Sequence, residues 1–294
     1  MRAWRVNELG HPTTALSLED IPSPEPAAGE VRIRVEATTV NFADILVCQG
    51  IYQDRPGVPL TPGTESCGII QAVGPGVDLA IGTRVAGMTN MKHGGFAEEA
   101  LVKAATALVM SDDLEAADAT VLYSTFQTAH VGLFHRCNLE AGDWVVILGA
   151  SSGVGAAAVQ LATARGARVI ATAGGEAKQA HCRTLGAEIT VDSTGDGAAD
   201  ALYEAAMQAT DGAGVSVAFD PVGGPLGEVT RRLMGFEGQL VVIGFTSGSI
   251  PSYPANHVLV KNYTVHGMAW AEYAARRRSV IETAHVDLLD LFRQ

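Results

Sequence analysis

Residues 149–155 combine glycines, alanine and two serines directly after an apolar run, a composition suited to binding a phosphate-bearing ligand. Residues 145–148 predict a buried parallel strand, and the apolar positions after Gly155 recur with helical spacing. A glycine-rich turn between a strand and a helix lets a pyrophosphate approach free N–H groups at the start of the helix. The sequence therefore predicts dinucleotide contacts from consecutive residues: Ala150, Ser151, Ser152, Gly153, Val154 and Gly155.

The same stretch fits two other enzyme signatures. It contains the G-x-S-x-G pattern of a serine hydrolase, in which Ser151 would be the nucleophile and Asp220 and His257 would follow as triad partners. Its glycine spacing also suits a short-chain dehydrogenase. That class needs a Tyr-x-x-x-Lys pair, and none of the six tyrosines has a lysine four residues later. On this stretch alone, the hydrolase and dinucleotide interpretations both stay open.

The segments after the turn favour the dinucleotide interpretation. A helix that ends near Gly166 leads to a second predicted strand at residues 168–173, which completes a βαβ unit. Further strands are predicted at residues 188–192, 215–220, 239–244 and 263–268. Six strands that alternate with helices predict an α/β fold with a doubly wound parallel sheet, and the glycine turn follows its first strand.

Length and composition agree with a two-domain globular chain. Its 294 residues, 47% of them apolar, can bury a large core. No apolar run reaches the ~18 residues of a membrane span, and the first residues lack the apolar centre of a signal peptide, so we expect a cytoplasmic location. A formal net charge of −12 argues against nucleic-acid or membrane partners. The four scattered cysteines are expected to be reduced packing residues: Cys48, Cys67, Cys137 and Cys182.

The first third of the chain has a different pattern. Residues 31–37 alternate between apolar and polar side chains, as expected for a half-buried antiparallel strand. Glycine and proline turns recur at residues 57–63, 74–76 and 94–95, so this part predicts a compact β-rich domain. An acidic, alanine-rich helix that begins near residues 114–120 marks the predicted boundary.

Nine stretches, taken in order, resemble the zinc-independent branch of the medium-chain dehydrogenase/reductase superfamily, the quinone oxidoreductase family. The resemblance covers nearly all of residues 1–270, and the stretches are residues 40–44, 50–52, 62–65, 73–77, 82–87, 94–98, 149–155, 220–224 and 243–245. It implies a GroES-like catalytic domain at residues 1–118 and a Rossmann dinucleotide-binding domain at residues 119–270.

Zinc-dependent relatives carry a Cys where this chain has Asn41, and a His where it has Thr64. Both replacements remove good zinc ligands, and the closely spaced cysteines of a structural zinc site are also missing. Three histidines, His93, His130 and His135, have no regular ligand pattern around them, so we expect surface or packing roles for them. No metal is expected.

The resemblance implies NADPH-dependent reduction of a small quinone or another α,β-unsaturated carbonyl compound by hydride transfer. Negative charge then develops on the carbonyl oxygen, and hydrogen-bond donors stabilise it. The expected donors are the Asn41 amide and the Tyr52 hydroxyl, with Asp44 orienting them. Asn41 and Asp44 as helix caps, and Tyr52 as a core residue, are the alternatives. Further cofactor contacts that the resemblance implies are Thr128, Gly244 and Phe245.

The end of the second predicted strand bears on the choice of cofactor. An NAD enzyme usually has an acidic residue there for the ribose hydroxyl, whereas residues 173–175 are Ala-Gly-Gly. Lys178 matches the lysine that binds the 2′-phosphate in the family, and Ser193 stands where the family commonly has a tyrosine that helps to hold that phosphate. Glu176 either faces the ribose or complements a helix dipole. NADPH is the expected cofactor, bound more weakly than is usual in the family.

The last residues depart from the family pattern. Residues 271–294 predict the last Rossmann helix, leading toward a return to the catalytic domain that is shortened by comparison with relatives. A catalytic domain without its return strands would expose an unpaired edge. The resemblance also implies a homodimer paired through residues 263–268. An NADPH-binding structural or interaction protein with little turnover, and a serine hydrolase that uses Ser151, are the alternative functions.

Overall fold

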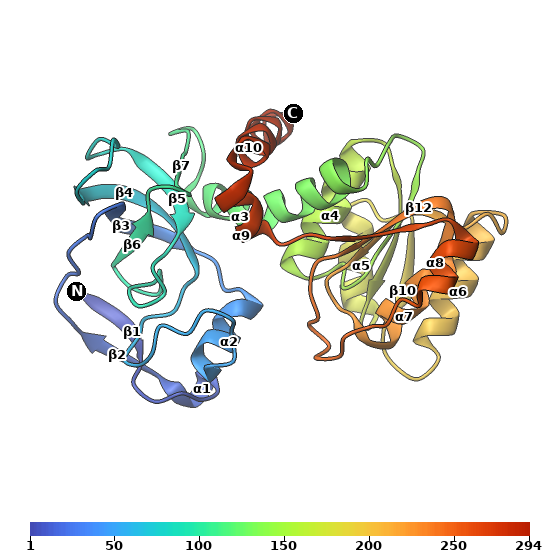
Figure 1. The fold of residues 1–294 in the computed structure, drawn as a ribbon, viewed down its shortest axis with the longest axis horizontal. Helices are drawn as coiled ribbons and strands as arrows, with labels where there is room; N and C mark the ends of the chain where they lie inside the picture. Colours follow the sequence, from blue (N-terminus) through green and yellow to red (C-terminus); the bar gives the residue numbers. More distant parts are fainter. The chain divides into compact units, whose positions relative to one another are not determined.

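The computed structural model describes all 294 residues, which divide into two compact units (Figure 1). Unit 1 comprises Met1–Ser124 and Ala274–Arg278, and unit 2 comprises Thr125–Tyr273 and Ser279–Gln294. The predicted boundary after residue 118 and the observed division after Ser124 both lie within one helix, α3 (Ala116–His130).

Unit 2 is built on a six-stranded parallel sheet, which confirms the predicted doubly wound architecture. The strand order is β10-β9-β8-β11-β12-β13, so the order reverses beside β8, the first strand in the sequence. In sheets of this kind, ligands bind outside the carboxyl ends of the strands at that reversal. The strands are β8 (Trp144–Ile147), β9 (Arg168–Ala173), β10 (Ile189–Asp192), β11 (Val215–Asp220), β12 (Met234–Val242) and β13 (Thr264–Gly267).

Helices cover both faces of this sheet, as the ribbon shows (Figure 1). The strands are therefore apolar on both sides, and Val146, Ile170, Ala218 and Leu240 are completely buried. The helical elements that follow α3 are η1 (Val131–Arg136), α4 (Gly153–Ala164), α5 (Glu176–Thr184), α6 (Ala198–Ala209), α7 (Gly224–Leu233), α8 (Ala255–Lys261), α9 (Trp270–Arg276) and α10 (Arg278–Phe292).

Unit 1 is β-rich, as predicted, and contains a five-stranded antiparallel sheet with the order β6-β3-β4-β5-β7. The predicted alternation is present in β3 (Glu30–Thr38), where Val31 and Ile33 are fully buried. The other elements of this unit are β1 (Arg2–Val6), α1 (Pro12–Ala15), β2 (Leu16–Asp20), α2 (Phe42–Gln49), β4 (Glu65–Val73), β5 (Arg84–Met88), β6 (Glu99–Lys103) and β7 (Leu108–Val109).

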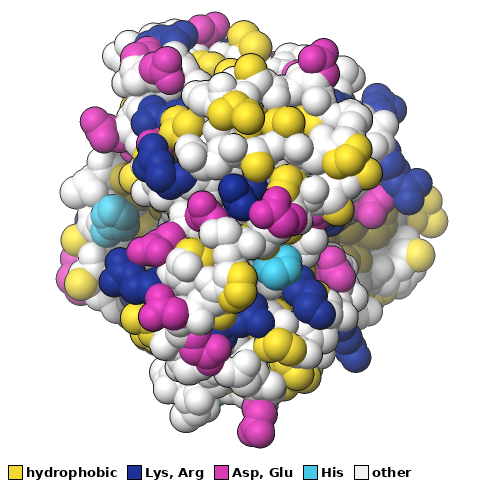
Figure 2. Space-filling view, turned by 90° about the vertical axis from the view of Figure 1, so that its left-hand side faces the viewer, with side chains coloured by type: hydrophobic (Ala, Val, Ile, Leu, Met, Phe, Trp, Pro, Cys, Tyr) yellow, Lys and Arg dark blue, Asp and Glu magenta, His cyan; other side chains and the backbone are white.

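The cysteines are buried packing residues, as predicted from their scattered positions in the sequence. All four cysteines are free and buried, and burial raises the pKa of the Cys48 and Cys67 thiols to about 11. On the face shown in Figure 2, acidic and basic side chains are interspersed rather than gathered by sign. None of the helices has the length and apolar character that a bilayer crossing requires.

Candidate active site

The glycine turn lies at the carboxyl end of β8, and two of its glycines are required by its geometry. Gly149 has a φ of +57°, a left-handed conformation that favours glycine, and a Cβ there would lie 2.9 Å from Cγ2 of Val222. A Cβ on Gly155 would overlap the carbonyl oxygen of Gly149 and lie 2.8 Å from Cα of Ala150. Gly155 therefore allows α4 to begin directly against the turn.

The first turn of α4 offers hydrogen-bond donors to an anion. Ser152 is the N-cap residue, and its hydroxyl accepts a hydrogen bond from the N–H of Gly155 at 3.3 Å. The N–H groups of Gly153 and Val154 have no acceptor within the chain. Because the helix dipole adds partial positive charge here, this end of α4 suits a phosphate group.

Ala150 differs from its neighbours in the predicted cofactor-binding stretch. It is fully buried, and its N–H donates to the carbonyl oxygen of Thr172 at 2.8 Å. The Thr172 hydroxyl accepts a further hydrogen bond from the N–H of Gly149 at 3.1 Å. Ala150 therefore anchors the turn to β9, while Ser151 is half-buried.

Asp220, at the end of β11, shapes the loop that faces this turn. Its carboxylate accepts hydrogen bonds from the N–H groups of Val222 at 2.9 Å and Gly223 at 2.7 Å, and from the Tyr253 hydroxyl at 3.4 Å. The carboxylate is buried, and burial raises its pKa. Asp220 thereby holds Val222 against Gly149, a positioning role that the sequence did not reveal.

Two cavities lie at the carboxyl ends of the sheet in unit 2, each of about 420 Å³. Gly149 and Ser193 line the first, and Gly244 and Phe245 line the second. Volumes of this size are typical of small-molecule and cofactor sites. Thr128, on α3, is half-buried and lines neither cavity.

The turn between β9 and α5 contains the predicted 2′-phosphate site. Lys178 is exposed on the first turns of α5 and has no ion-pair partner. The Glu176 carboxylate forms an ion pair with Arg183, which lies on the same helix. A cation is thus available beside this turn.

In unit 1, Asp44 joins α2 to the start of β4 through backbone groups. Its buried carboxylate accepts hydrogen bonds from the N–H groups of Asn41 at 2.7 Å, Thr64 at 2.9 Å and Gly63 at 3.1 Å. Burial raises the pKa of Asp44, and these three bonds oppose that change. Asp44 therefore positions the main chain around Asn41, and no hydrogen bond joins it to the Tyr52 hydroxyl.

The Asn41 amide is held in one orientation by Glu65. Its Nδ2 donates to Oε1 of Glu65 at 2.9 Å and to the Thr39 hydroxyl at 2.9 Å. A carboxylate can only accept, so the amide nitrogen must face Glu65 and both of its N–H groups are used. The Asn41 side chain also accepts from the backbone N–H of Asp44, and the Asp44 carboxylate accepts from the N–H of Asn41, so the two residues form a capping box at the start of α2. The structure thus shows the helix-capping role that was the alternative for Asn41 and Asp44.

Tyr52 follows α2 and retains a free hydroxyl. Its ring packs beside a buried cluster that includes Val6, Val47 and Leu60, and the side chain is only partly exposed. No protein group bonds to the hydroxyl. Tyr52 therefore combines the packing role with a donor that is available to a ligand.

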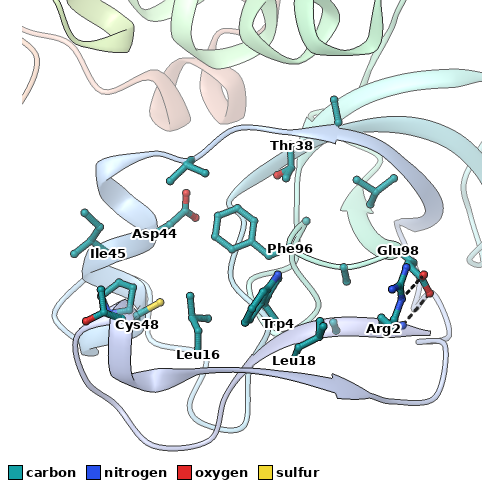
Figure 3. Close-up of a pocket in the computed structure, with 18 of the residues that line it drawn as sticks. Arg2, Trp4, Leu16, Leu18, Thr38, Asp44, Ile45, Cys48, Phe96 and Glu98 are labelled. Atoms are coloured by element: carbon teal, nitrogen blue, oxygen red, sulfur yellow. Dashed lines mark hydrogen bonds and ion pairs between the residues drawn. The ribbon is translucent and has the colours of Figure 1, made fainter.

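A separate apolar groove of about 1040 Å³ lies in unit 1 (Figure 3). Trp4, Leu16, Leu18 and Phe96 point into it from the strands and the loop around it. Of the predicted substrate residues only Asp44 lines it. The groove lies beside β2, which pairs with β1 alone.

The residues at the positions of the zinc ligands do not fit a metal. The Asn41 nitrogen is bonded to Glu65, and no group of three or more His, Cys, Asp or Glu side chains is arranged to bind an ion. His130 bonds to Asp287 at 2.6 Å and His135 packs edge-on against Tyr273, so both side chains are held by contacts within the fold.

The serine hydrolase triad does not form. Asp220 is bonded to the backbone of its own loop and to Tyr253, and His257 packs against the ring of Tyr263. No hydrogen bond joins Ser151, His257 and Asp220. Without that relay Ser151 lacks the base that would activate it.

Two family models match the chain. The alcohol dehydrogenase GroES-like domain matches residues 27–112, and the zinc-binding dehydrogenase domain matches residues 153–285. The second description mentions zinc, although the residues around Asn41 do not form a zinc site.

Relatives and solved structures extend these matches over the whole chain. A quinone oxidoreductase-like protein 2 homolog from Nematostella vectensis is 35% identical and covers 99% of this chain and 78% of its own length. A mycobacterial protein solved in complex with NADPH superposes with a TM-score of 0.88 at 27% identity, over 100% of this chain and 89% of its own. The CurK enoyl reductase superposes with a TM-score of 0.83 at 26% identity, over 100% and 88%. The chain therefore belongs to the quinone oxidoreductase-like proteins of the medium-chain dehydrogenase/reductase superfamily.

Proposed function

We propose that this protein is an NADPH-dependent reductase that transfers a hydride to quinones or other α,β-unsaturated carbonyl compounds. The turn between β8 and α4 carries the proposal, because its free N–H groups and its close-packed glycines suit a pyrophosphate. A relative named as a quinone oxidoreductase-like protein and a solved enoyl reductase support the reaction class.

Unit 2 would bind the cofactor. Ser151, Ser152, Gly153 and Val154 would contact the pyrophosphate, with Gly155 and Ala150 shaping the turn. In the same unit, Lys178 and Ser193 would hold the 2′-phosphate, and Thr128, Gly244 and Phe245 would lie along the rest of the cofactor. Bound NADPH supplies the hydride, and the chain's own residues bind and orient the reactants.

Unit 1 would contribute the groups that bind the acceptor. The free Tyr52 hydroxyl can donate to a carbonyl oxygen on which charge develops, a contact that stabilises the transition state more than the ground state. Glu65 fixes the orientation of the Asn41 amide within this unit. No side chain of this unit stands out as a general acid, so solvent would deliver the final proton.

Oxidation of NADPH against a panel of quinones, enones and enoyl thioesters tests the reaction. We expect turnover with at least one class. Tight binding of NADPH without turnover on any acceptor would favour the alternative of an NADPH-binding structural or interaction protein.

The Lys178→Ala variant tests the assignment of the cofactor. Loss of the cation should weaken NADPH binding by about tenfold and leave NADH binding unchanged, because only NADPH carries the 2′-phosphate. Lys103→Ala, on the end of β6 in unit 1, is the matched control. Equal loss of both dinucleotides in Lys178→Ala would contradict the assignment.

We also infer that two copies associate through β13. This strand is the last in the sheet and pairs with β12 alone, so its outer edge is open to a second chain. Light scattering should give twice the monomer mass, and a Val265→Pro substitution in β13 should reduce it.

A further inference from the structure

The turn between β9 and α5 has no acidic residue of its own at positions 173–175, but Asp192 places a carboxylate beside it. Asp192 is the last residue of β10, which pairs in parallel with β9, so both strands end at the same edge of the sheet. Oδ1 of Asp192 accepts a hydrogen bond from the N–H of Gly175 at 3.1 Å. Gly175 is the residue from which α5 begins. The acidic group is therefore supplied by the neighbouring strand.

The Asp192 carboxylate is fixed in place and stays ionised. Oδ1 also accepts hydrogen bonds from the N–H of Thr194 at 2.9 Å and from its hydroxyl at 2.8 Å. These bonds hold the pKa of Asp192 below its ordinary value. Oδ2 has no protein partner and the side chain is exposed, so one acceptor oxygen stays available to a ligand.

Two opposite charges thus flank one turn. Lys178 lies on α5, just after Gly175, and Asp192 is bonded to Gly175 itself. Ser193, the next residue after Asp192, lines the cavity at the carboxyl ends of β8 and β9. An ionised carboxylate repels a phosphate and accepts a hydrogen bond from a ribose hydroxyl, whereas a lysine favours the phosphate.

We propose that Asp192 is a determinant of cofactor specificity, which opposes Lys178 and leaves the site able to accept NADH as well as NADPH. The inference rests on the proposed dinucleotide site of unit 2. It explains how a chain with no acidic residue at 173–175 can still offer an acceptor to a ribose 2′-hydroxyl.

The Asp192→Asn variant tests this inference. Asparagine has the same shape and its Oδ1 can still accept from Gly175 and Thr194, so the fold of the turn is retained while the charge is removed. Dissociation constants for NADPH and NADH are measured by calorimetry on the wild type and the variant. The ratio Kd(NADH)/Kd(NADPH) should rise by about 3- to 10-fold at low salt, and the rise should shrink at high salt.

The Asp196→Asn variant is the matched control, because Asp196 follows Asp192 on the same loop and lines the cavity that Ser193 lines, but has no bond to the Gly175 turn. Its ratio should stay close to that of the wild type. Asp192→Ser removes the same charge and should give the same shift as Asp192→Asn.

Three results would overturn the inference. If the ratio is unchanged in Asp192→Asn and Asp192→Ser while the wild type binds both dinucleotides, the role of Asp192 in specificity is contradicted and the dinucleotide site itself is not. An equal shift in Asp196→Asn attributes the effect to overall charge. Failure of the wild type to bind either dinucleotide removes the proposed function as well.

Discussion

The backbone of Gly155 packs directly against the carbonyl oxygen of Gly149, with no room between them for a Cβ atom. This contact sets where α4 begins relative to β8, and hence where the free N–H groups of Gly153 and Val154 lie. The position of the proposed phosphate site therefore depends on the absence of one side chain.

Gly155→Ala should displace the turn. The added methyl group would meet backbone atoms, which cannot rotate away, so we expect a loss of about 1 to 3 kcal/mol in the free energy of unfolding. Dinucleotide affinity should fall as well. Urea denaturation and calorimetry measure the two effects.

Gly153→Ala is the matched control for stability. A Cβ there would lie 3.7 Å from Cγ2 of Thr125, an ordinary contact. We expect unfolding close to that of the wild type, although the methyl group stands where a ligand would approach. Equal stability of the two variants would contradict the packing role of Gly155.

Asn41→Asp should make the stability of the fold depend on pH. The new carboxylate would stand beside Oε1 of Glu65, which now accepts from the amide at 2.9 Å. Repulsion between two carboxylates this close raises the pKa of one of them. Both are ionised at pH 8, where their repulsion destabilises the fold. The repulsion falls when the pair takes up a proton at lower pH. The difference in unfolding free energy from the wild type should narrow between pH 8 and pH 5.5, with Asn41→Ala as a control that shows no such narrowing.

The sequence predicted the elements that depend on local patterns. The strand before Gly149, the helix after Gly155 and the alternation in β3 each follow from the identity of adjacent residues, and all three are present. Close packing of Gly155 also follows from its place in the motif, since the last glycine of such a turn contacts the strand.

The partners of the polar side chains could not be predicted in the same way. Glu65 lies 24 residues from Asn41, and Asp192 lies 17 residues from Gly175. Each pair meets only because two elements end at the same edge of a sheet or pack at the same corner. Only a prediction that β9 and β10 pair in parallel could have indicated that Asp192 lies beside the turn after β9.

Asp44→Asn should change how stability depends on pH. Burial raises the pKa of Asp44 in the folded protein above its value in the unfolded chain, so the folded state holds the proton more strongly. The contribution of Asp44 is therefore largest in acid and falls as pH rises from about 4 through the raised pKa. The wild type minus variant difference in unfolding free energy should be widest near pH 4 and narrower at pH 8.

If the difference in unfolding free energy between the wild type and Asp44→Asn is the same at pH 4 and pH 8, the raised pKa of Asp44 does not contribute to the pH dependence of stability. The variant itself should be less stable by about 1 to 3 kcal/mol, because the Asn41 N–H would face an amide nitrogen in place of Oδ2.

Tyr52→Phe and Tyr123→Phe should separate function from stability. The Tyr123 hydroxyl is buried, donates to the carbonyl oxygen of Thr106 at 2.9 Å and accepts from the N–H of Met88 at 3.1 Å. Its removal should lower the free energy of unfolding by about 1 to 3 kcal/mol, because two backbone groups lose their partner. The Tyr52 hydroxyl has no protein partner, so Tyr52→Phe should unfold like the wild type and lower kcat/KM by about tenfold, the loss of one hydrogen bond to the developing charge. Unchanged kcat/KM in Tyr52→Phe would leave packing against Val47 and Leu60 as the role of this ring.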